Sequence, residues 1–285
     1  MARYNRDMDT PDQTERLLSV LCELNHVVVA FSGGVDSAVV AAAAVRVLGS
    51  KARAVTGDSA SVPRAELEAA IRLAKHIGIA HRLVKTDEFA DPDYLKNDGS
   101  RCYFCKSELY GSIAVEPGEA IVSGANLDDR GDYRPGLTAA AERGVRHPLQ
   151  EAGFTKADVR RLAREWDLPV ADKPASPCLS SRVVPGLAVT PERLGRIEAA
   201  EAYLKSLGVI DCRVRYHEGD LARVELPTAE LARFLESVAR ERLTAKLREL
   251  GFRFVTLDLD GLRSGSLNAL IPLTVKSRFP AGDVA

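Results

Sequence analysis

The sequence carries almost no net charge, no long apolar run and no pattern of an export signal. Its 39 Lys and Arg residues are balanced by 40 Asp and Glu residues, which argues against a large nucleic-acid-binding surface. The longest apolar stretch, 38–45, ends at Arg46 and is far too short to span a membrane. The N-terminal segment MARYNRDMDTPDQTER is polar, so no signal peptide is predicted. We therefore expect a cytoplasmic protein without nucleic-acid or membrane partners.

The chain contains few cysteines, and their number is odd: five in 285 residues. In a chain without secretory features, this usage favours metal-binding or catalytic thiols over a disulfide framework. Cys22 lies on the apolar stripe of a predicted helix, and Cys212 shares a strand face with core residues, so both are expected to be buried and inert. The other three are Cys102 and Cys105, spaced C-x-x-C, and Cys178 in a Pro- and Ser-rich loop.

A single C-x-x-C is compatible with zinc, an iron–sulfur cluster or a redox pair. The sequence lacks a second C-x-x-C, so a closed four-cysteine zinc site would need Cys22 or Cys212. Three loop cysteines instead suit an iron–sulfur cluster whose fourth iron is left free for chemistry.

The phosphate-binding motifs G-x-x-x-x-G-K-S/T and G-x-G-x-x-G are also absent, but a different glycine turn is present. The segment 27–45, VVVAFSGGVDSAVVAAAAV, runs from an apolar strand through a tight turn into a helix. A helix N-terminus presents free N–H groups and a positive dipole end, which bind anions. Asp36 suits a phosphate site only with a cation such as Mg²⁺ between the charges. The alternative is an ordinary turn with Asp36 or Ser37 as helix cap. The predicted site residues here are Ser32, Gly33, Gly34, Asp36 and Ser37.

Strand and helix patterns alternate through the first part of the chain. Apolar, β-branched segments predict strands at 27–31, 52–58, 81–86 and 119–126. Apolar residues at helical spacing predict helices at 14–24, 62–77 and 155–169, besides the one after the glycine turn. This alternation predicts an α/β fold with a doubly wound parallel sheet. Ligands lie at the carboxyl ends of such strands, so Gly57, Asp58 and Gly124 should meet the glycine turn.

The pattern changes near residue 185, where VVPGLAVTPE indicates a linker. Beyond it, the predicted order is helix 191–207, strands 209–216 and 221–226, helix 228–250 and strand 252–259. We therefore predict domains at 12–185 and 190–265, the second a smaller α+β domain, and a tail at 266–285.

The two middle strands of the second domain carry charged residues on alternate positions. If they pair in register, one face holds Arg213, Arg215, His217, Arg223 and Glu225. This face is either an anion site, because arginine favours bidentate phosphate contacts, or a solvated sheet surface.

Five segments together are more specific than any one of them: AFSGGVDS, RCYFCK, GANLDDRGDYRPGL, KADVRRLAREWDLPVADKPASPCLSSR and RYHEGDLARVELP. The glycine turn resembles the SGGxDS loop of the PP-loop ATP pyrophosphatases, a HUP-like fold that cleaves ATP to AMP and pyrophosphate. The whole set, over about residues 14–265, resembles the LarE family of ATP-dependent sulfur transferases. The resemblance implies that the substrate is pyridinium-3,5-biscarboxylate mononucleotide. Its carboxylates would become thiocarboxylates for the nickel-pincer cofactor.

The resemblance also implies a source of sulfur. Some members give up the sulfur of their own cysteine, and others carry a [4Fe–4S] cluster with an extra sulfide. The presence of Cys102, Cys105 and Cys178 suggests the cluster type, in which all three are ligands, but leaves Cys178 as an alternative donor. Arg182 would hold a carboxylate or phosphate and lower the pKa of the Cys178 thiol.

Further roles follow from the same resemblance. Arg213 and Arg215 would bind the substrate phosphate, and Glu201 and Glu225 would form a second metal site. Independently of the resemblance, a cluster of charged residues in the loop after the fourth strand is expected to contact metal or substrate, the alternative being a solvated acidic turn. The residues of this acidic loop are Asp128, Asp129, Asp132 and Arg134. A homo-oligomer is expected.

Two other functions stay open at this point. A tRNA 2-thiolation enzyme shares the adenylation chemistry, but should have a basic RNA-binding domain, which the charge balance does not support. A non-catalytic nucleotide or redox sensor could retain the glycine turn. The intact Ser32, Asp36 and Ser37, together with the three cysteines, argue against a sensor.

Overall fold

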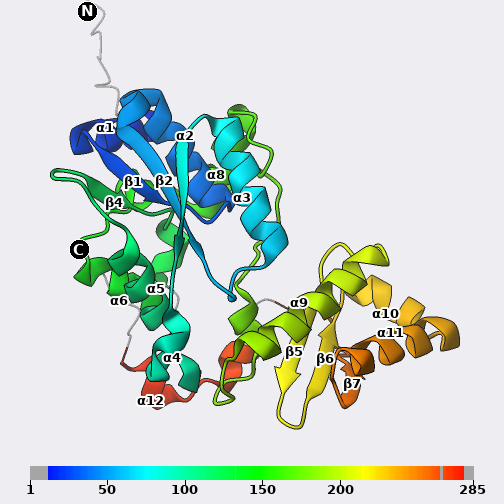
Figure 1. Cartoon of the computed structure of the whole chain (residues 1–285). Coiled ribbons are helices and arrows are strands. Elements are labelled where there is room, and N and C mark those ends of the chain that lie inside the picture. The colour runs from blue at the N-terminus through cyan, green and yellow to red at the C-terminus, as the bar shows by residue number, and fades with distance from the viewer. Residues whose placement is uncertain (1–11, 132, 264–265, 279–285) are drawn as a thin grey trace, which may run out of the picture.

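Two separate sheets organise the chain in the computed structural model, which describes residues 12–131, 133–263 and 266–278 (Figure 1). The first sheet is parallel and has the strand order β3-β2-β1-β4. Its strands are β1 (Val27–Ala30), β2 (Ala52–Asp58), β3 (Ala80–Lys85) and β4 (Ala120–Val122). The predicted parallel α/β sheet is thereby confirmed, with each strand within a few residues of its expected place.

Helices cover both faces of this sheet. Alternate residues of the central strand β1 are therefore buried in different cores. Val27 and Val29 pack in the larger core, whereas Val28 packs in a smaller one on the opposite face. The longer helices that contribute to the larger core are α1 (Gln13–Leu24), α2 (Val35–Leu48), α3 (Arg64–Ile77) and α8 (Lys156–Glu165), and the short α7 (Pro148–Glu151) adds Leu149. Those of the smaller core are α5 (Arg101–Ser112) and α6 (Pro135–Glu142).

The second sheet lies in the C-terminal part of the chain, coloured yellow to orange in Figure 1. Strands β5 (Arg213–His217) and β6 (Leu221–Glu225) are antiparallel, and β7 (Phe254–Leu257) runs parallel to β6. Helix α9 (Pro191–Ser206) packs against β5. This core also takes Tyr94 and Leu179 from the N-terminal part. The domain limits at 185 and 190 stay a prediction.

The helix predicted over 228–250 is two helices, α10 (Thr228–Leu235) and α11 (Ser237–Glu249). Glu236 between them has an extended backbone, with φ −62° and ψ 142°. In one continuous helix, Phe234 and Leu243 would lie on opposite faces, since nine residues turn the helix by two and a half turns. The break lets both side chains enter the same core, where they are 3% and 5% exposed.

The burial of the two cysteines expected in the cores differs. Cys212 is buried, as predicted, and burial raises the pKa of its thiol to about 12. The prediction for Cys22 is wrong, because this residue is exposed. Helix α1 turns Leu17 and Leu21 inward, and Cys22 lies one residue round the helix from that face.

The other α-helices of the described residues are short: α4 (Pro92–Lys96), α7 (Pro148–Glu151) and α12 (Leu273–Lys276). Part of the predicted tail is therefore helical, and Val275 in it is largely buried. Within the described part of the chain, no helix has the length and apolar character needed to cross a bilayer.

Candidate functional site

The glycine turn lies at the carboxyl end of β1 and leads directly into α2. Gly33 has φ +71°, and a Cβ atom there would come within 2.8 Å of the Cβ of Ala70 on α3. A Cβ at Gly124, just after β4, would approach the backbone nitrogen of Ser37 to 2.7 Å. Both positions need glycine because helices and strand ends converge on the turn. The structure thus brings Gly124 to the turn, as the topology predicted.

Gly57 lies elsewhere along the strand ends. A Cβ atom there would be 3.1 Å from Cδ1 of Leu109 on α5 and 3.5 Å from Cγ2 of Thr86. This glycine therefore permits close packing of β2 on α5, and its predicted contact with a ligand stays a prediction.

The two serine hydroxyls of the turn bond to each other and to the turn backbone. The Oγ atoms of Ser32 and Ser37 are 3.2 Å apart, and Ser37 Oγ donates to the carbonyl of Gly34 at 3.1 Å. The amide of Gly34 donates in turn to Ser32 Oγ at 3.3 Å. These contacts gather the two hydroxyls and the Gly34 amide at the N-terminus of α2, where an anion would be stabilised.

Asp36 follows the turn and has a partner on each carboxylate oxygen. Its Oδ2 forms an ion pair with Lys156 Nζ at 2.5 Å, and its Oδ1 accepts a hydrogen bond from Asn126 Nδ2 at 3.1 Å. Lys156 is the first residue of α8, whose N-terminus is capped by Thr155 and Asp158. A cation in the first turn of a helix opposes the helix dipole. That local conflict is the sequence signal that could have identified Lys156, which our sequence reasoning missed.

The acidic loop after β4 uses its carboxylates to hold the residues around Asp36. Asp129 accepts from the amide of Asn126 at 2.9 Å and pairs with Arg134 at 2.8 Å. Asp128 accepts from the amide of Lys156 at 3.0 Å. The loop therefore fixes both partners of Asp36. Asp132, the other acidic residue predicted in this loop, lies outside the described residues.

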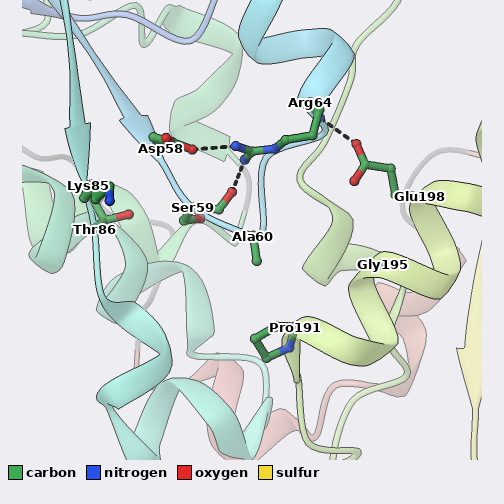
Figure 2. A pocket seen from close by; sticks show the side chains of 9 residues that line it. All are labelled: Asp58, Ser59, Ala60, Arg64, Lys85, Thr86, Pro191, Gly195 and Glu198. Carbon is green, nitrogen blue, oxygen red and sulfur yellow. Dashed lines mark hydrogen bonds and ion pairs between the residues drawn. The ribbon is translucent and has the colours of Figure 1, made fainter.

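A cavity of about 470 Å³ opens beside the carboxyl ends of β2 and β3, facing α9 (Figure 2). Arg64 crosses its edge, because its guanidinium pairs with Asp58 at 2.5 Å while its backbone amide donates to Glu198 of α9 at 2.6 Å. The lining residues are Asp58, Ser59, Ala60, Arg64, Lys85, Thr86, Pro191, Gly195 and Glu198. The cavity thus lies between the first sheet and α9, at the strand ends where a ligand was expected.

The three predicted thiols come from two segments. Cys102 and Cys105 lie on α5, so the expectation that they are loop residues is wrong, whereas Cys178 lies in a loop before a single 3₁₀ turn (Leu179–Arg182). Burial raises the pKa of Cys105 to about 12; Lys106 opposes this, and the neighbouring Cys178 and Cys102 add to it. The thiols are therefore close enough to influence one another. Among the described residues, no three His, Cys, Asp or Glu side chains are arranged to hold a single metal ion.

Arg182 connects the Cys178 loop to α9. Its side chain is 2% exposed and pairs with Glu201 at 3.0 Å, while Nη1 donates to the carbonyls of Pro177 at 2.5 Å and Cys178 at 3.1 Å. Glu201 also accepts from the amide of Val214 on β5. The guanidinium therefore fixes the backbone that carries Cys178, and its predicted catalytic role stays a prediction.

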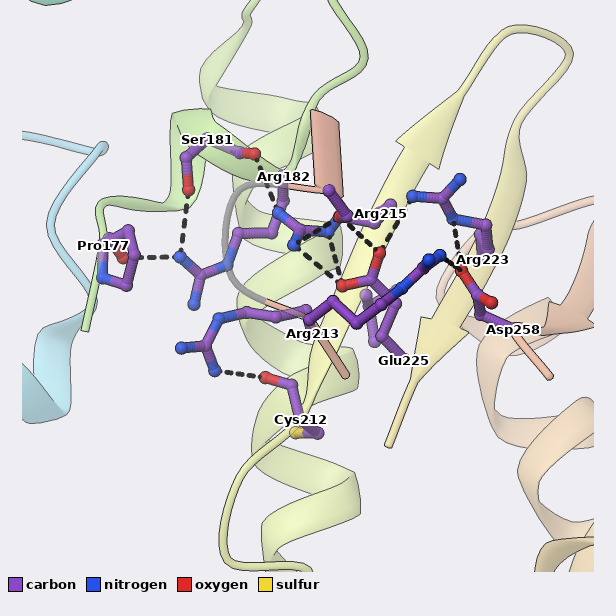
Figure 3. A network of polar contacts seen from close by, with 12 residues as sticks. Pro177, Ser181, Arg182, Cys212, Arg213, Arg215, Arg223, Glu225 and Asp258 are labelled. Atoms are coloured by element: carbon purple, nitrogen blue, oxygen red, sulfur yellow. Dashed lines mark hydrogen bonds and ion pairs between the residues drawn. The ribbon is translucent and has the colours of Figure 1, made fainter. Parts of the chain in front are cut away.

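The charged face of the second sheet forms, because β5 and β6 align these residues across the strands (Figure 3). Arg213 lies opposite Glu225, and Arg215 lies opposite Arg223. Arg215 and Arg223 both contact the Glu225 carboxylate, at 2.8 and 2.9 Å. Burial would raise the pKa of Glu225, but the hydrogen bond and charge of Arg215 outweigh it and lower the pKa. Arg215 is 7% and Glu225 0% exposed, so this is not a fully solvated face.

Arg213 lies at the rim of this face and is half-buried. It donates to the carbonyl of Cys212 at 2.7 Å (Figure 3). It also pairs with Asp211 and donates to the carbonyl of Ala175, three residues before Cys178, at 3.1 Å. The face therefore meets the loop that carries the third thiol. Because Glu201 and Glu225 are both paired with arginines, a second metal site at these residues stays a prediction.

Known proteins resemble this chain over most of its length. A pyridinium-3,5-bisthiocarboxylic acid mononucleotide synthase of Lactiplantibacillus plantarum is 41% identical over 257 residues, which cover 88% of this chain and 92% of that enzyme. An uncharacterized protein of a Synechocystis species is 46% identical over 261 residues, covering 90% of this chain and 97% of the relative. An uncharacterized protein of Methanocaldococcus jannaschii is 26% identical over 242 residues, which cover 84% of this chain and 91% of the relative. The asparagine synthase family model matches residues 23–97, which include the glycine turn.

Proposed function

This chain belongs to the LarE family of ATP-dependent sulfurtransferases, with a PP-loop ATP pyrophosphatase domain, and on that premise we propose its substrate and product. The substrate is pyridinium-3,5-biscarboxylate mononucleotide, and the product carries thiocarboxylates in place of carboxylates, on the route to the nickel-pincer cofactor. The L. plantarum relative is named for the corresponding bisthiocarboxylic acid. The observation that carries the proposal is the SGGVDS turn, with Gly124 packed against it at the strand ends.

Adenylation solves the chemical difficulty of this reaction. A carboxylate is a poor electrophile because its oxygen is a poor leaving group. If the carboxylate attacks the α-phosphorus of ATP, pyrophosphate departs and an acyl adenylate forms. A sulfur nucleophile then attacks the acyl carbon, and AMP leaves with the former carboxylate oxygen.

The turn and α8 supply the groups that would stabilise the departing pyrophosphate. The amides and hydroxyls of Ser32, Gly34 and Ser37 converge at the N-terminus of α2. Lys156, paired with Asp36 at 2.5 Å, adds a positive charge beside them. The adenosine part of ATP would lie in the 470 Å³ cavity at the carboxyl ends of β2 and β3. ATP therefore spans the strand ends in this proposal.

The oxygen donors of the turn also fit Mg²⁺, which prefers carboxylate and hydroxyl oxygens together with phosphate. Asp36 would hold it once its carboxylate exchanges Lys156 for the ion, and the ion would neutralise charge on the triphosphate. Lys156 would then be free to contact a phosphate oxygen.

The donor set of the three thiols fits a [4Fe–4S] cluster, because thiolates are its usual ligands. Cys102 and Cys105 are three residues apart on α5 and share its face, and Cys178 approaches from the loop. When bound, the cluster would supply the sulfide that is transferred. Arg213 and Arg215 would bind the substrate phosphate, since the first lies at the rim of the charged face and both adjoin the Cys178 loop.

Product analysis tests this proposal. Purified protein, ATP, Mg²⁺, sulfide and the carboxylated mononucleotide should yield AMP, pyrophosphate and a product in which sulfur has replaced oxygen, detected by mass spectrometry. Omitting the mononucleotide should abolish pyrophosphate release. Formation of ADP would exclude the adenylation chemistry. Thiolation of tRNA in place of the mononucleotide would favour the tRNA 2-thiolation enzyme.

A further inference from the structure

One face of α5 combines thiols with positive charge. Arg101 and Cys105 are four residues apart, as are Cys102 and Lys106, so the four side chains occupy neighbouring positions on the helix surface. The two cations differ in their contacts. Arg101 donates to Asn97 Oδ1 and, at 2.9 Å, to the carbonyl of Ser180. Within the described part of the chain, the half-buried ammonium of Lys106 has neither a hydrogen bond nor an ion pair.

Along α5, Lys106 lies between Cys102, one helical turn before it, and Tyr110, one turn after it. Despite burial, which would lower it, the pKa of Lys106 is raised by the neighbouring charges of Tyr110, Cys105, Cys102 and Cys178. Tyr110 packs in the same core as Val28 of β1, the strand that leads into the glycine turn.

The start of α6 leaves room for the Lys106 side chain. A Cβ atom at Gly136 would come within 3.0 Å of Lys106 Cγ and 3.6 Å of the carbonyl oxygen of Cys102. Gly136 is the glycine of the DYRPG segment, to which the proposed function gives no role. Its lack of a side chain allows α6 to pack on α5 without displacing the ammonium from the face with the thiols.

We infer that Lys106 binds the carboxyl group of the substrate at the place where sulfur replaces oxygen. The inference rests on the proposed function, because the acyl carbon must be bonded to AMP and also be reached by sulfur. It therefore has to lie between the glycine turn and the thiols. Lys106 is on the helix that carries two of the thiols and that packs, through Tyr110, beside the strand leading into the turn. An ammonium there stabilises the carboxylate before activation and the oxyanion during sulfur attack.

In this step, hydrosulfide attacks the carbonyl carbon of the acyl adenylate and a C–S bond forms. The carbonyl π electrons move to the oxygen, which Lys106 stabilises as an oxyanion. When the carbonyl re-forms, the bond from carbon to the phosphate oxygen breaks and AMP leaves with that electron pair. The thioacid then releases its proton to water.

Lys106→Met tests the inference, with the exposed Lys75→Met as the matched control. The dissociation constant of the carboxylated mononucleotide, measured by equilibrium dialysis without ATP, should rise about 10-fold or more in Lys106→Met, as expected for a hydrogen bond to a charged group. The rate of thiocarboxylate formation should fall about 100-fold, as when an oxyanion donor is removed. The dissociation constant of ATP should change less than twofold, and Lys75→Met should match the wild type in all three.

A second variant controls for misfolding of Lys106→Met. Gly136→Ala keeps the ammonium but crowds the aliphatic part of the Lys106 side chain. It should therefore also weaken mononucleotide binding and slow thiocarboxylate formation, each by less than Lys106→Met does. If mononucleotide binding in Lys106→Met equals that of the wild type while sulfur transfer falls, the residue acts on sulfur and the inference is wrong. Wild-type rates and binding in both variants would also overturn it, with the proposed function intact. A wild-type protein that makes no thiocarboxylate would refute the proposed function itself.

Discussion

Lys156 Nζ lies 2.5 Å from Asp36 Oδ2, although 120 residues separate the two in the sequence. The pair joins the N-terminus of α8 to the glycine turn at the N-terminus of α2. Two helix N-termini, both positive ends of dipoles, therefore approach one carboxylate. An incoming triphosphate would meet a region in which Lys156 already supplies a positive charge.

Lys156→Met should weaken ATP binding and slow adenylation. Loss of one charge-assisted phosphate contact should raise the KM for ATP about 10-fold. The KM for the mononucleotide should change little, because Lys156 lies at the turn. Initial rates of pyrophosphate release at varied ATP concentration measure this effect. An unchanged KM and rate for ATP would restrict Lys156 to holding Asp36 in place.

Arg215→Met should destabilise the protein, and the loss should depend on pH. Removing Arg215 leaves the buried Glu225 with less compensation, and breaking such a pair typically costs about 3–5 kcal/mol. The pKa of Glu225 is lowered in the folded protein, so the stability that the pair contributes is present above the unfolded pKa and is lost as the pH falls through the folded one. Urea unfolding at neutral and acidic pH should show the difference between the two proteins shrinking on acidification. A constant difference would contradict this.

Arg213→Gln isolates binding from stability, because Arg213 lies at the rim and its ion pair with Asp211 is only partly buried. If this arginine binds the substrate phosphate, the KM for the mononucleotide should rise about 10-fold while the KM for ATP stays constant. Arg233→Gln is a suitable control, since Arg233 is exposed and pairs within its own helix. Equal changes in the two KM values would argue that Arg213 has no selective role.

The three thiols allow a clear test of the sulfur source. If they hold a cluster, anaerobic protein should be brown, contain about four irons and turn over repeatedly when sulfide is supplied. Alanine at any one of Cys102, Cys105 or Cys178 should remove colour and turnover together. If Cys178 is the donor, Cys102→Ala should retain one turnover, and the mass of the spent protein should fall by one H₂S.

Much of this site could be predicted from the sequence, because its signals are local. The SGGVDS turn, the β-strand that precedes it and the helix that follows are contiguous, and the pairing of β5 with β6 follows from their alternation. The partners of Asp36 could not be predicted, because Lys156 and Asn126 reach it only through the packing of α8 and β4 beside α2. The helix break at Glu236 is likewise set by the tertiary core, in which Phe234 and Leu243 share one side.

The two wrong predictions for cysteines show two limits of helical patterns in a sequence. A helical stripe identifies a face only to within one residue, and Cys22 lies just outside the buried pair Leu17 and Leu21. Pattern alone also gave no helix at RCYFCK, whose polar and apolar residues do not separate into two faces on α5.

The most direct test of the central claim follows the carboxylate oxygen. The carboxylated mononucleotide, labelled with ¹⁸O in its carboxylates, is incubated with ATP, Mg²⁺, sulfide and the protein, and the nucleotide products are analysed by mass spectrometry. The acyl-adenylate route predicts that each sulfur transferred places one ¹⁸O in the phosphate of AMP and none in pyrophosphate. AMP without the label, formed alongside the thiocarboxylate, would contradict the account, because the carboxylate oxygen would then have left by another path.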